Sequence, residues 1–285
     1  MHTEKLRVYV NGRIVPAGSA ISVFDWGFNY GYGLFETIRA YSGVPAFLED
    51  HLERLRSSAR ALQIATDGLE GIEREIEKLI RLNGLEGTDS RVKIVLTKGV
   101  SMDVTSLPEK PTLIITVAPV DVERIERLKR DGINAVLLDG WGGCGRHKTL
   151  NHLKNIMGRM EALKRGGREG IFTTKRGTVL EGTASNLFVV EAGCLKTPPL
   201  KGGHILPGVT RKKILEVAEE LGIHTIECRL KREELFKAEG LFLTNSVLEV
   251  VPVKSLDGKR VGSLTGRKIT RNLQKAFSKL ILRGR

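Results

Sequence analysis

The sequence has few cysteines and no long apolar run. Its three cysteines, Cys144, Cys194 and Cys228, are widely spaced and form no CxxC pair, which argues against a disulfide framework and against a zinc site. No stretch stays apolar for long enough to span a bilayer, and the N-terminal residues lack the pattern of a secretory signal peptide. We therefore expect a cytoplasmic protein without a metal site and without a membrane partner.

Aromatic residues are also scarce, at 5% of the chain, and they do not alternate with basic residues. Lysine and arginine number 46 against 33 acidic residues, which gives a formal net charge of +13. The basic residues are spread along the chain and mixed with acids, as in "RIERLKR" at 124–130. This distribution is typical of solvated helix faces and of proteins with anionic small-molecule ligands, so we expect no nucleic-acid partner.

The 285 residues are enough for two domains, and the first 120 predict a smaller α+β domain. Alternating apolar residues flank the turn signals Asn11-Gly12 and Ser42-Gly43, which indicates two β-hairpins. Apolar residues at helical spacing follow, and then two runs typical of strands. The elements expected there are helices within 49–64 and 72–84 and strands within 91–99 and 111–120.

The charged stretch 121–132 is expected to link this domain to a larger α/β domain at 133–285. The larger domain should begin with a strand at 133–138 and continue, after Lys148, with a helix that ends at Gly166-Gly167. That helix carries an apolar stripe, which consists of Leu153, Ile156, Met157, Met160 and Leu163. Short strands, a helix within 206–222 and a basic C-terminal helix within 265–282 complete the expected order.

The segment "GWGGCGRHKT" at 140–149 superficially resembles a phosphate-binding loop. The Walker pattern requires Gly, four residues, and then Gly-Lys-Ser/Thr without interruption. Here Arg146 and His147 separate Gly145 from Lys148, so the loop geometry is broken and we reject a nucleotide phosphatase or kinase. The histidines form no HExxH motif, and no nucleophile-elbow pattern is present.

Several segments together resemble the class IV (fold type IV) pyridoxal-phosphate enzymes, which include branched-chain and D-amino-acid aminotransferases and aminodeoxychorismate lyase. These segments occur in the order of the family and span nearly the whole chain. They are "YGLFETIRAY" at 32–41, "HLERL" at 51–55, "HKTLN" at 147–151, "EGIFTTKRGTVLEGTASNLFVV" at 169–190 and "TPPL…ILPGVTR" at 197–211. The resemblance implies a two-domain α+β fold with pyridoxal 5′-phosphate (PLP) bound between the domains, and a homodimer.

The resemblance assigns the reactive lysine and the carboxylate that faces the cofactor ring. PLP needs a lysine that forms a Schiff base and later moves protons, and this role falls on Lys148. The cofactor is an electron sink only while its ring nitrogen is protonated, and a carboxylate against that nitrogen favours the charged form. Glu181, in "VLEGTASN", matches the glutamate of the family. The alternative for Glu181 is an exposed acid at the end of a strand.

The resemblance also assigns ligands to the 5′-phosphate of the cofactor. A dianion is bound well by an arginine fork and by backbone amides at the start of a helix. Gly208 provides the turn before the amides of Val209 and Thr210, and Arg54 in "HLERL" matches the phosphate arginine of the family. Ser246 falls near the hydroxyl that binds phosphate. Arg54 has an alternative interpretation as a solvated helix residue.

Residues near the substrate distinguish the possible reactions. Phe35 and Thr37 lie in "FETIR" where branched-chain enzymes carry "FEGIR", and Lys98 in "VLTKG" stands where D-amino-acid aminotransferases carry an arginine that receives the substrate carboxylate. Thr37 is compatible with a lyase, in which it would help to protonate the departing pyruvate unit, or with an ordinary β-branched strand residue. His152 is interpreted as a helix residue rather than a ligand.

We predict a PLP-dependent aminotransferase that moves an amino group between a small, branched-chain-like amino acid and a 2-oxo acid. The alternative is 4-amino-4-deoxychorismate lyase, which releases pyruvate and 4-aminobenzoate. A D-amino-acid aminotransferase is the third candidate, and Lys98 counts against it because a lysine is a less directional carboxylate partner than an arginine.

Overall fold

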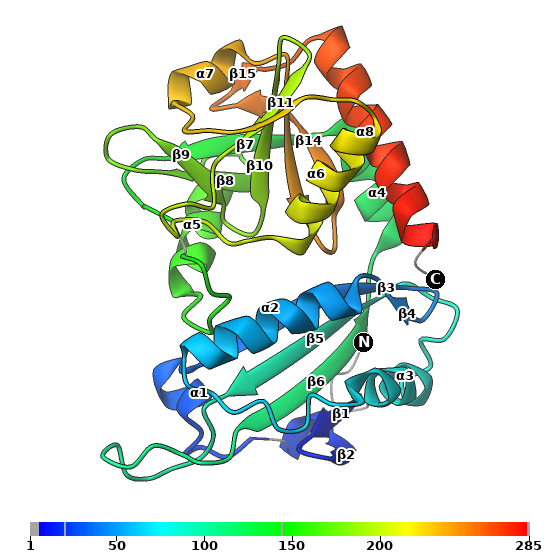
Figure 1. Ribbon diagram of the computed structural model, residues 1–285, viewed down its shortest axis with the longest axis vertical. Coiled ribbons are helices and arrows are strands. Elements are labelled where there is room, and N and C mark those ends of the chain that lie inside the picture. Colours follow the sequence, from blue (N-terminus) through cyan, green and yellow to red (C-terminus); the bar gives the residue numbers. More distant parts are fainter. Residues whose placement is uncertain (1–5, 20, 144, 284–285) are drawn as a thin grey trace. The chain divides into compact units, whose positions relative to one another are not determined.

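The computed structural model describes residues 6–19, 21–143 and 145–283, so Cys144 lies outside the described residues. The chain divides into two compact units, which Figure 1 shows in ribbon form. The first comprises Met1–Val120 together with His147–Asn151, and the second comprises Asp121–Arg146 and His152–Gly284. The domain boundaries 1–120, 121–132 and 133–285 stay a prediction; helix α4 (Val122–Asp131) occupies most of the segment that we expected to be a linker.

The first unit is built on an antiparallel six-stranded sheet with the strand order β2-β1-β6-β5-β3-β4. The strands are β1 (Arg7–Val10), β2 (Arg13–Pro16), β3 (Gly33–Tyr41), β4 (Val44–Pro45), β5 (Ser90–Thr97) and β6 (Thr112–Pro119). The helices are η2 (Ala17–Ser19), α1 (Trp26–Tyr30), α2 (Leu48–Ala61) and α3 (Ile72–Leu82). Both expected hairpins form, because Asn11 and Ser42 adopt positive φ before Gly12 and Gly43.

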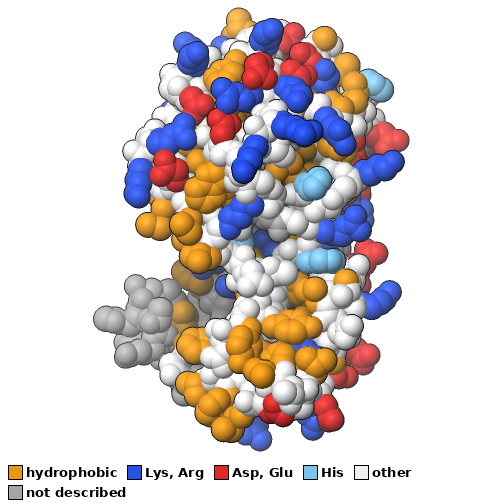
Figure 2. Space-filling view, turned by 90° about the vertical axis from the view of Figure 1, so that its left-hand side faces the viewer, with side chains coloured by type: hydrophobic (Ala, Val, Ile, Leu, Met, Phe, Trp, Pro, Cys, Tyr) orange, Lys and Arg blue, Asp and Glu red, His pale blue; other side chains and the backbone are white. Residues whose placement is uncertain are grey.

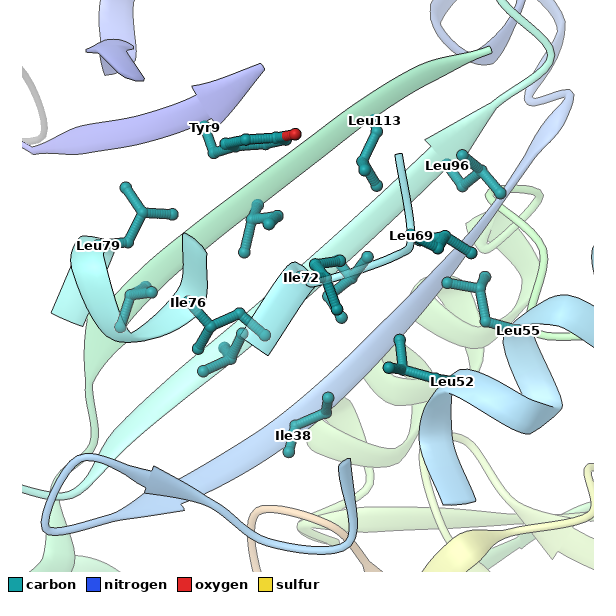
Figure 3. Packing of buried hydrophobic residues seen from close by; sticks show 14 of the residues in the cluster. Tyr9, Ile38, Leu52, Leu55, Leu69, Ile72, Ile76, Leu79, Leu96 and Leu113 are labelled. Carbon is teal, nitrogen blue, oxygen red and sulfur yellow. The ribbon is translucent and has the colours of Figure 1, made fainter. Parts of the chain in front are cut away.

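Side chains alternate between the two faces of this sheet, and one face carries the core of the first unit. Leu34 and Ile38 on β3 lie opposite Leu96 and Val92 on β5, and all four side chains are buried. Helices α2 and α3 cover them with their apolar stripes, as Figure 3 shows for Leu52, Leu55, Ile72 and Ile76. Residues of the other parity, among them Phe35, Thr37 and Lys93, therefore belong to the opposite face.

The second unit is built on a mixed nine-stranded sheet, in which the main path runs β12-β11-β10-β13-β14-β7-β8-β9 and β15 pairs with β14. Its strands are β7 (Ile133–Leu138), β8 (Glu169–Thr173), β9 (Val179–Gly182), β10 (Asn186–Glu191), β11 (Cys194–Thr197), β12 (Thr225–Glu227), β13 (Gly240–Asn245), β14 (Glu249–Leu256) and β15 (Lys259–Arg260). Its helices are α4, α5 (Leu153–Lys164), α6 (Val209–Glu220), α7 (Arg232–Lys237) and α8 (Leu264–Arg283).

Helix α5 packs with its small residues and exposes its apolar stripe. Gly158 and Ala162 are buried, and an added Cβ at Gly158 would lie 2.8 Å from the ring of Phe172. The five residues of the stripe, in contrast, are 51–69% exposed. Helical periodicity alone therefore identified the helix correctly but not the side that packs against its own sheet.

Charged side chains are intermixed on the molecular face drawn in Figure 2, as the sequence indicated. None of the helices within 6–19, 21–143 and 145–283 is long and apolar enough to cross a membrane.

Candidate active site

Lys148 lies in an extended segment that pairs with the edge of strand β3. Phe35 donates its backbone N–H to the carbonyl of Lys148 at 2.9 Å, and Leu150 donates to the carbonyl of Gly33 at 2.9 Å. Thr149 and Leu34 form an antiparallel bridge between these bonds. The backbone of Lys148 is thus fixed by a strand of the first unit, and helix α5 begins only at Leu153.

The side chain of Lys148 reaches back over the same strand. Its Nζ lies 4.3 Å from the centre of the Phe35 ring, and Phe35 is 9% exposed. The Nζ of Lys93 lies 5.1 Å from the same ring. Burial, with a smaller contribution from Arg91, holds the pKa of Lys93 below its usual value of 10.5. The amines of two lysines therefore lie over one aromatic ring.

Sequence reasoning missed Lys93, although a signal for it exists. Lys93 stands between Val92 and Ile94 in a strand whose alternation sends those two side chains into the core. It pairs directly with Thr37, which is half-buried and shares its face of the sheet. The segment "VLTKG" points to Lys98 instead. Its Nζ donates to the carbonyl of Gln63 at 2.6 Å, beyond the end of β5.

Arg54 belongs to a buried charged cluster on the helix-covered face of the first sheet. Its side chain is 10% exposed, so it is not a solvated helix residue. Its Nε donates to Glu36 Oε1 at 2.8 Å and its Nη2 to Glu36 Oε2 at 2.5 Å. His51 Nδ1 lies 2.7 Å from Glu36 Oε2. Glu36 occupies the core-facing register between Leu34 and Ile38, a place where a charge requires close partners.

Glu181 is buried in the second unit rather than exposed at a strand end. It lies on β9 and is 4% exposed. Its Oε2 accepts hydrogen bonds from the backbone N–H of Leu206 at 3.0 Å and from Nδ2 of Asn186 at 3.3 Å. Asn186 also donates to the carbonyl of Leu206 at 2.9 Å, which ties the carboxylate to the segment that enters helix α6. A buried carboxylate held in this way is suited to face a cationic group.

The N-terminus of helix α6 has the features of an anion site. Its N-cap residue is Gly208, which has no side chain to cap the helix. The cap residue therefore offers no side-chain acceptor to the first backbone amides, those of Val209 and Thr210. A Cβ at Gly208 would overlap Oδ1 of Asn186, which explains why glycine stands there. Thr244 lies opposite Asn186 on β13, and its buried Oγ1 makes no hydrogen bond within the described part of the chain.

Ser246 follows β13 in a turn that Asn245 organises. Oδ1 of Asn245 accepts hydrogen bonds from the N–H groups of Val247 at 3.0 Å and Leu248 at 2.8 Å. Ser246 is half-buried and follows Thr244 by two residues.

His152 is the N-cap residue of helix α5, and its side chain makes no capping hydrogen bond to the helix.

A second buried glutamate supports the loop between Glu181 and Asn186. Glu169 accepts hydrogen bonds from the backbone and hydroxyl of Thr183 and from Oγ of Ser185, and it pairs with Arg159 at 2.7 Å. Burial raises the pKa of Glu169 above its usual value of 4.5, against the lowering effect of Arg159 and the hydrogen bonds. The described residues contain no group of three or more His, Cys, Asp or Glu side chains that could hold a metal ion.

Comparison with known proteins decides the family. The family model described as amino-transferase class IV matches residues 33–256, which include all the segments above from β3 to β14. The chain belongs to the class IV aminotransferases. Their fold is the mixed two-domain α+β fold seen here, and the enzymes of this family are PLP-dependent. The resemblance found in the sequence, and with it the expected fold class and cofactor, is therefore confirmed.

Individual relatives carry different activities. Aminodeoxychorismate lyase of Bacillus subtilis is 35% identical over 278 residues, covering 96% of this chain and 94% of that protein. A putative branched-chain-amino-acid aminotransferase of Methanocaldococcus jannaschii is also 35% identical, with 95% of each chain covered. The branched-chain amino acid aminotransferase structure of Escherichia coli has a TM-score of 0.85 at 30% identity, covering 96% of this chain and 94% of that one. A PLP-bound hypothetical aminotransferase from Mycobacterium tuberculosis has a TM-score of 0.84 at 26% identity, covering 96% and 99%.

Proposed function

We propose that this class IV enzyme is an aminotransferase for a small, branched-chain-like amino acid and a 2-oxo acid, with Lys148 as the residue that carries PLP. The main support is the position of Lys148. Its Nζ lies 4.3 Å from the Phe35 ring centre, and its backbone is hydrogen-bonded to strand β3. A lysine fixed in this way keeps its amine within reach of one reacting carbon, which is the requirement for covalent attachment and for proton transfer.

Several residues have the chemistry that PLP requires. Glu181, buried and held by Asn186, has the chemistry to keep a ring nitrogen protonated. Arg54, the amides of Val209 and Thr210, and Ser246 are the proposed phosphate ligands, and the glycine N-cap of α6 leaves room for an anion. When bound, the cofactor supplies an electron sink for the carbanion at the substrate Cα.

The remaining steps are assigned to side chains of the first unit. Lys148 would act as the acid–base group, because its amine could take the proton from the substrate Cα and give it back, which is the proton shift that transamination requires. Phe35 covers the reacting atoms with an apolar ring, and Thr37 and Lys98 are proposed substrate contacts. We add Lys93, because its half-buried ammonium lies beside the same ring and suits a substrate carboxylate.

The lyase is the second candidate, and one pairing favours it. Thr37 lies directly opposite Lys93, so its hydroxyl has a half-buried cation as its cross-strand neighbour. A hydroxyl beside an ammonium is a suitable donor of a proton to a departing pyruvate unit. A D-amino-acid aminotransferase is the third candidate, although the engagement of Lys98 with Gln63 weakens the match on which it rests.

One pair of assays separates these reactions. The purified enzyme is given 4-amino-4-deoxychorismate, with pyruvate as the readout, and in parallel a panel of L- and D-amino acids with 2-oxoglutarate. The proposal predicts that L-valine, L-leucine and L-isoleucine give the highest kcat/KM. Pyruvate release that exceeds every transamination rate would replace it by the lyase, and a preference for D-amino acids would replace it by the third candidate.

We also propose a cytoplasmic homodimer. Exposed apolar side chains gather in residues 21–30, where Val23 and Phe28 are 64% and 71% exposed, and along helix α5. Such stretches are typical of surfaces that a partner covers. Light scattering coupled to size exclusion measures the assembly, and a mass of 31.5 kDa, that of one chain, would contradict the dimer.

A further inference from the structure

Glu36 contacts both His51 and Arg54. The proposed function assigns a role to Arg54 but none to Glu36 or His51. The side edge of the Arg54 guanidinium, formed by Nε and Nη2, donates two hydrogen bonds to the two oxygens of Glu36. Such a fork fixes the plane of the guanidinium as well as its position. It therefore also fixes the direction of the other edge, formed by Nη1 and the second hydrogen of Nη2.

The charge states in this cluster follow from the surroundings of each group. Burial raises the pKa of Glu36, but Arg54 and His51 overcome this effect and bring it to about 2. Glu36 is therefore a carboxylate at neutral pH, and it only accepts hydrogen bonds. Burial lowers the pKa of His51 below 6.5, so the ring is neutral at neutral pH. The cluster then holds one negative charge and one positive charge.

These charge states fix the tautomer of His51. Since Glu36 Oε2 accepts at 2.7 Å, the hydrogen of the neutral ring must be on Nδ1. The contact of 3.5 Å between Arg54 Nη2 and His51 Nδ1 is then an approach of two donors, not a hydrogen bond. Both donors converge on Glu36 Oε2, so His51 holds the carboxylate in the rotamer that receives the arginine.

We propose that Glu36, held in place by His51, is the positioning residue that aims the end-on edge of Arg54 at the phosphate of the cofactor. This inference rests on the proposed role of Arg54. A long arginine side chain loses much rotamer freedom when it binds an anion. A partner that has already fixed the guanidinium removes that loss from the binding step. Because Glu36 is buried at 1% exposure, it acts through Arg54 and does not itself meet the ligand.

A comparison of PLP with pyridoxal tests the proposal, because pyridoxal carries the reactive aldehyde but no phosphate. Dissociation constants for both are measured by absorbance titration of the apo form of each variant, and the ratio of pyridoxal to PLP constants reports the phosphate contribution alone. We expect Glu36→Gln to lower this ratio about tenfold, as the loss of one charge-assisted contact implies. Arg54→Ala should lower it further, and Glu36→Gln should add nothing in the Arg54→Ala background.

Two further variants keep the test decisive. Arg39 lies on the same strand as Glu36 and pairs with the carboxylate of Asp89 at 2.7 Å. Asp89→Asn removes that carboxylate from the same unit, and it should leave the ratio unchanged. His51→Ala should lower the ratio less than Glu36→Gln, and His51→Asn, whose amide can replace the Nδ1 donor, should restore it. If Glu36→Gln does not fold, the His51 pair alone decides.

The outcomes separate this inference from the proposed function. An unchanged or increased ratio in Glu36→Gln, or a loss in Asp89→Asn as large as in Glu36→Gln, would overturn the positioning role. If instead Arg54→Ala leaves the ratio at the parent value, the phosphate assignment itself fails. If neither aldehyde gives the absorbance of a lysine adduct in the parent, the assignment of Lys148 fails first.

Discussion

Thr37 on β3 and Lys93 on β5 are direct cross-strand partners, and their side chains share the face of the sheet that carries Phe35. This pairing brings a half-buried ammonium to the ring over which Lys148 Nζ lies. It makes Lys93 a better placed carboxylate partner than Lys98.

Substitution of the two lysines should therefore have unequal effects. We expect Lys93→Met to lower kcat/KM for the amino acid by roughly ten- to a hundredfold, the range of one hydrogen bond to a charged group. Lys98→Met should change it less than threefold, because Nζ of Lys98 already binds the carbonyl of Gln63. Steady-state kinetics decide the matter, and the reverse order would return the substrate carboxylate to Lys98.

Glu181→Gln should reduce turnover far more than cofactor occupancy. The amide keeps the shape of the side chain but removes the charge that favours a protonated ring nitrogen. We expect a rise in barrier of about 3 kcal/mol, or roughly a hundredfold in kcat. Glu191→Gln on β10, the next strand along the chain, is a suitable control for a loss of charge in the same unit. Near-normal kcat in Glu181→Gln would mean that another acid faces the ring.

Gly208→Ala should disturb both the anion site and Glu181. The added Cβ would overlap Oδ1 of Asn186, and the Nδ2 of the same side chain donates to Oε2 of Glu181. We expect a loss of about 1–3 kcal/mol in the free energy of unfolding, as in other overpacked sites, and weaker PLP binding. Gly18→Ala, where an added Cβ meets nothing within 4 Å, is the matched control. Wild-type PLP affinity in Gly208→Ala would show that the start of α6 does not hold the phosphate.

The stability of the protein should fall in acid because of Glu36. Its pKa is about 2 in the folded protein against 4.5 for the free side chain, so the folded state releases its proton more readily than the unfolded state. The stabilisation is complete above pH 4.5 and is lost as the pH falls from 4.5 towards 2; its size is roughly 3 kcal/mol. His51, whose pKa is lowered from 6.5, adds a loss in the same direction as the pH falls below 6.5.

Denaturant unfolding at several pH values measures this dependence. In Glu36→Gln the slope between pH 4.5 and pH 2 should be reduced. An equal slope in the parent and in Glu36→Gln would show that other carboxylates cause the acid sensitivity.

Local sequence signals were sufficient for the regular elements of the fold. The turns at Asn11-Gly12 and Ser42-Gly43 require positive φ, and the stripes of α2 and α3 match the core that they cover. Helix α5 forms as predicted, but periodicity reports an apolar side and not what lies against it; the stripe is exposed, and Gly158 and Ala162 make the close contact. The segment 121–132, which we predicted to be a linker, contains helix α4, and Asp121 caps this helix by accepting from the N–H of Arg124.

The sequence predicted those candidate site residues that lie in a family motif. It did not predict those that are brought together only by the pairing of strands. Lys148, Glu181 and the start of α6 stood in recognisable segments. Lys93 and Glu36 became visible only through strand register, which sets which side chains share a face. Glu36 had one local signal, a charge in the core-facing parity between Leu34 and Ile38, and His51 and Arg54 stand three residues apart on the helix that faces it.

Peptide mapping tests whether the cofactor is attached to Lys148. The holoenzyme is reduced with borohydride, digested, and its peptides are mapped by mass spectrometry. We expect a single pyridoxyl adduct, on the peptide that contains Lys148. An adduct on Lys154, whose Nζ donates to the carbonyls of Gly142 and Gly143, on Lys164 or on Lys93 would contradict it.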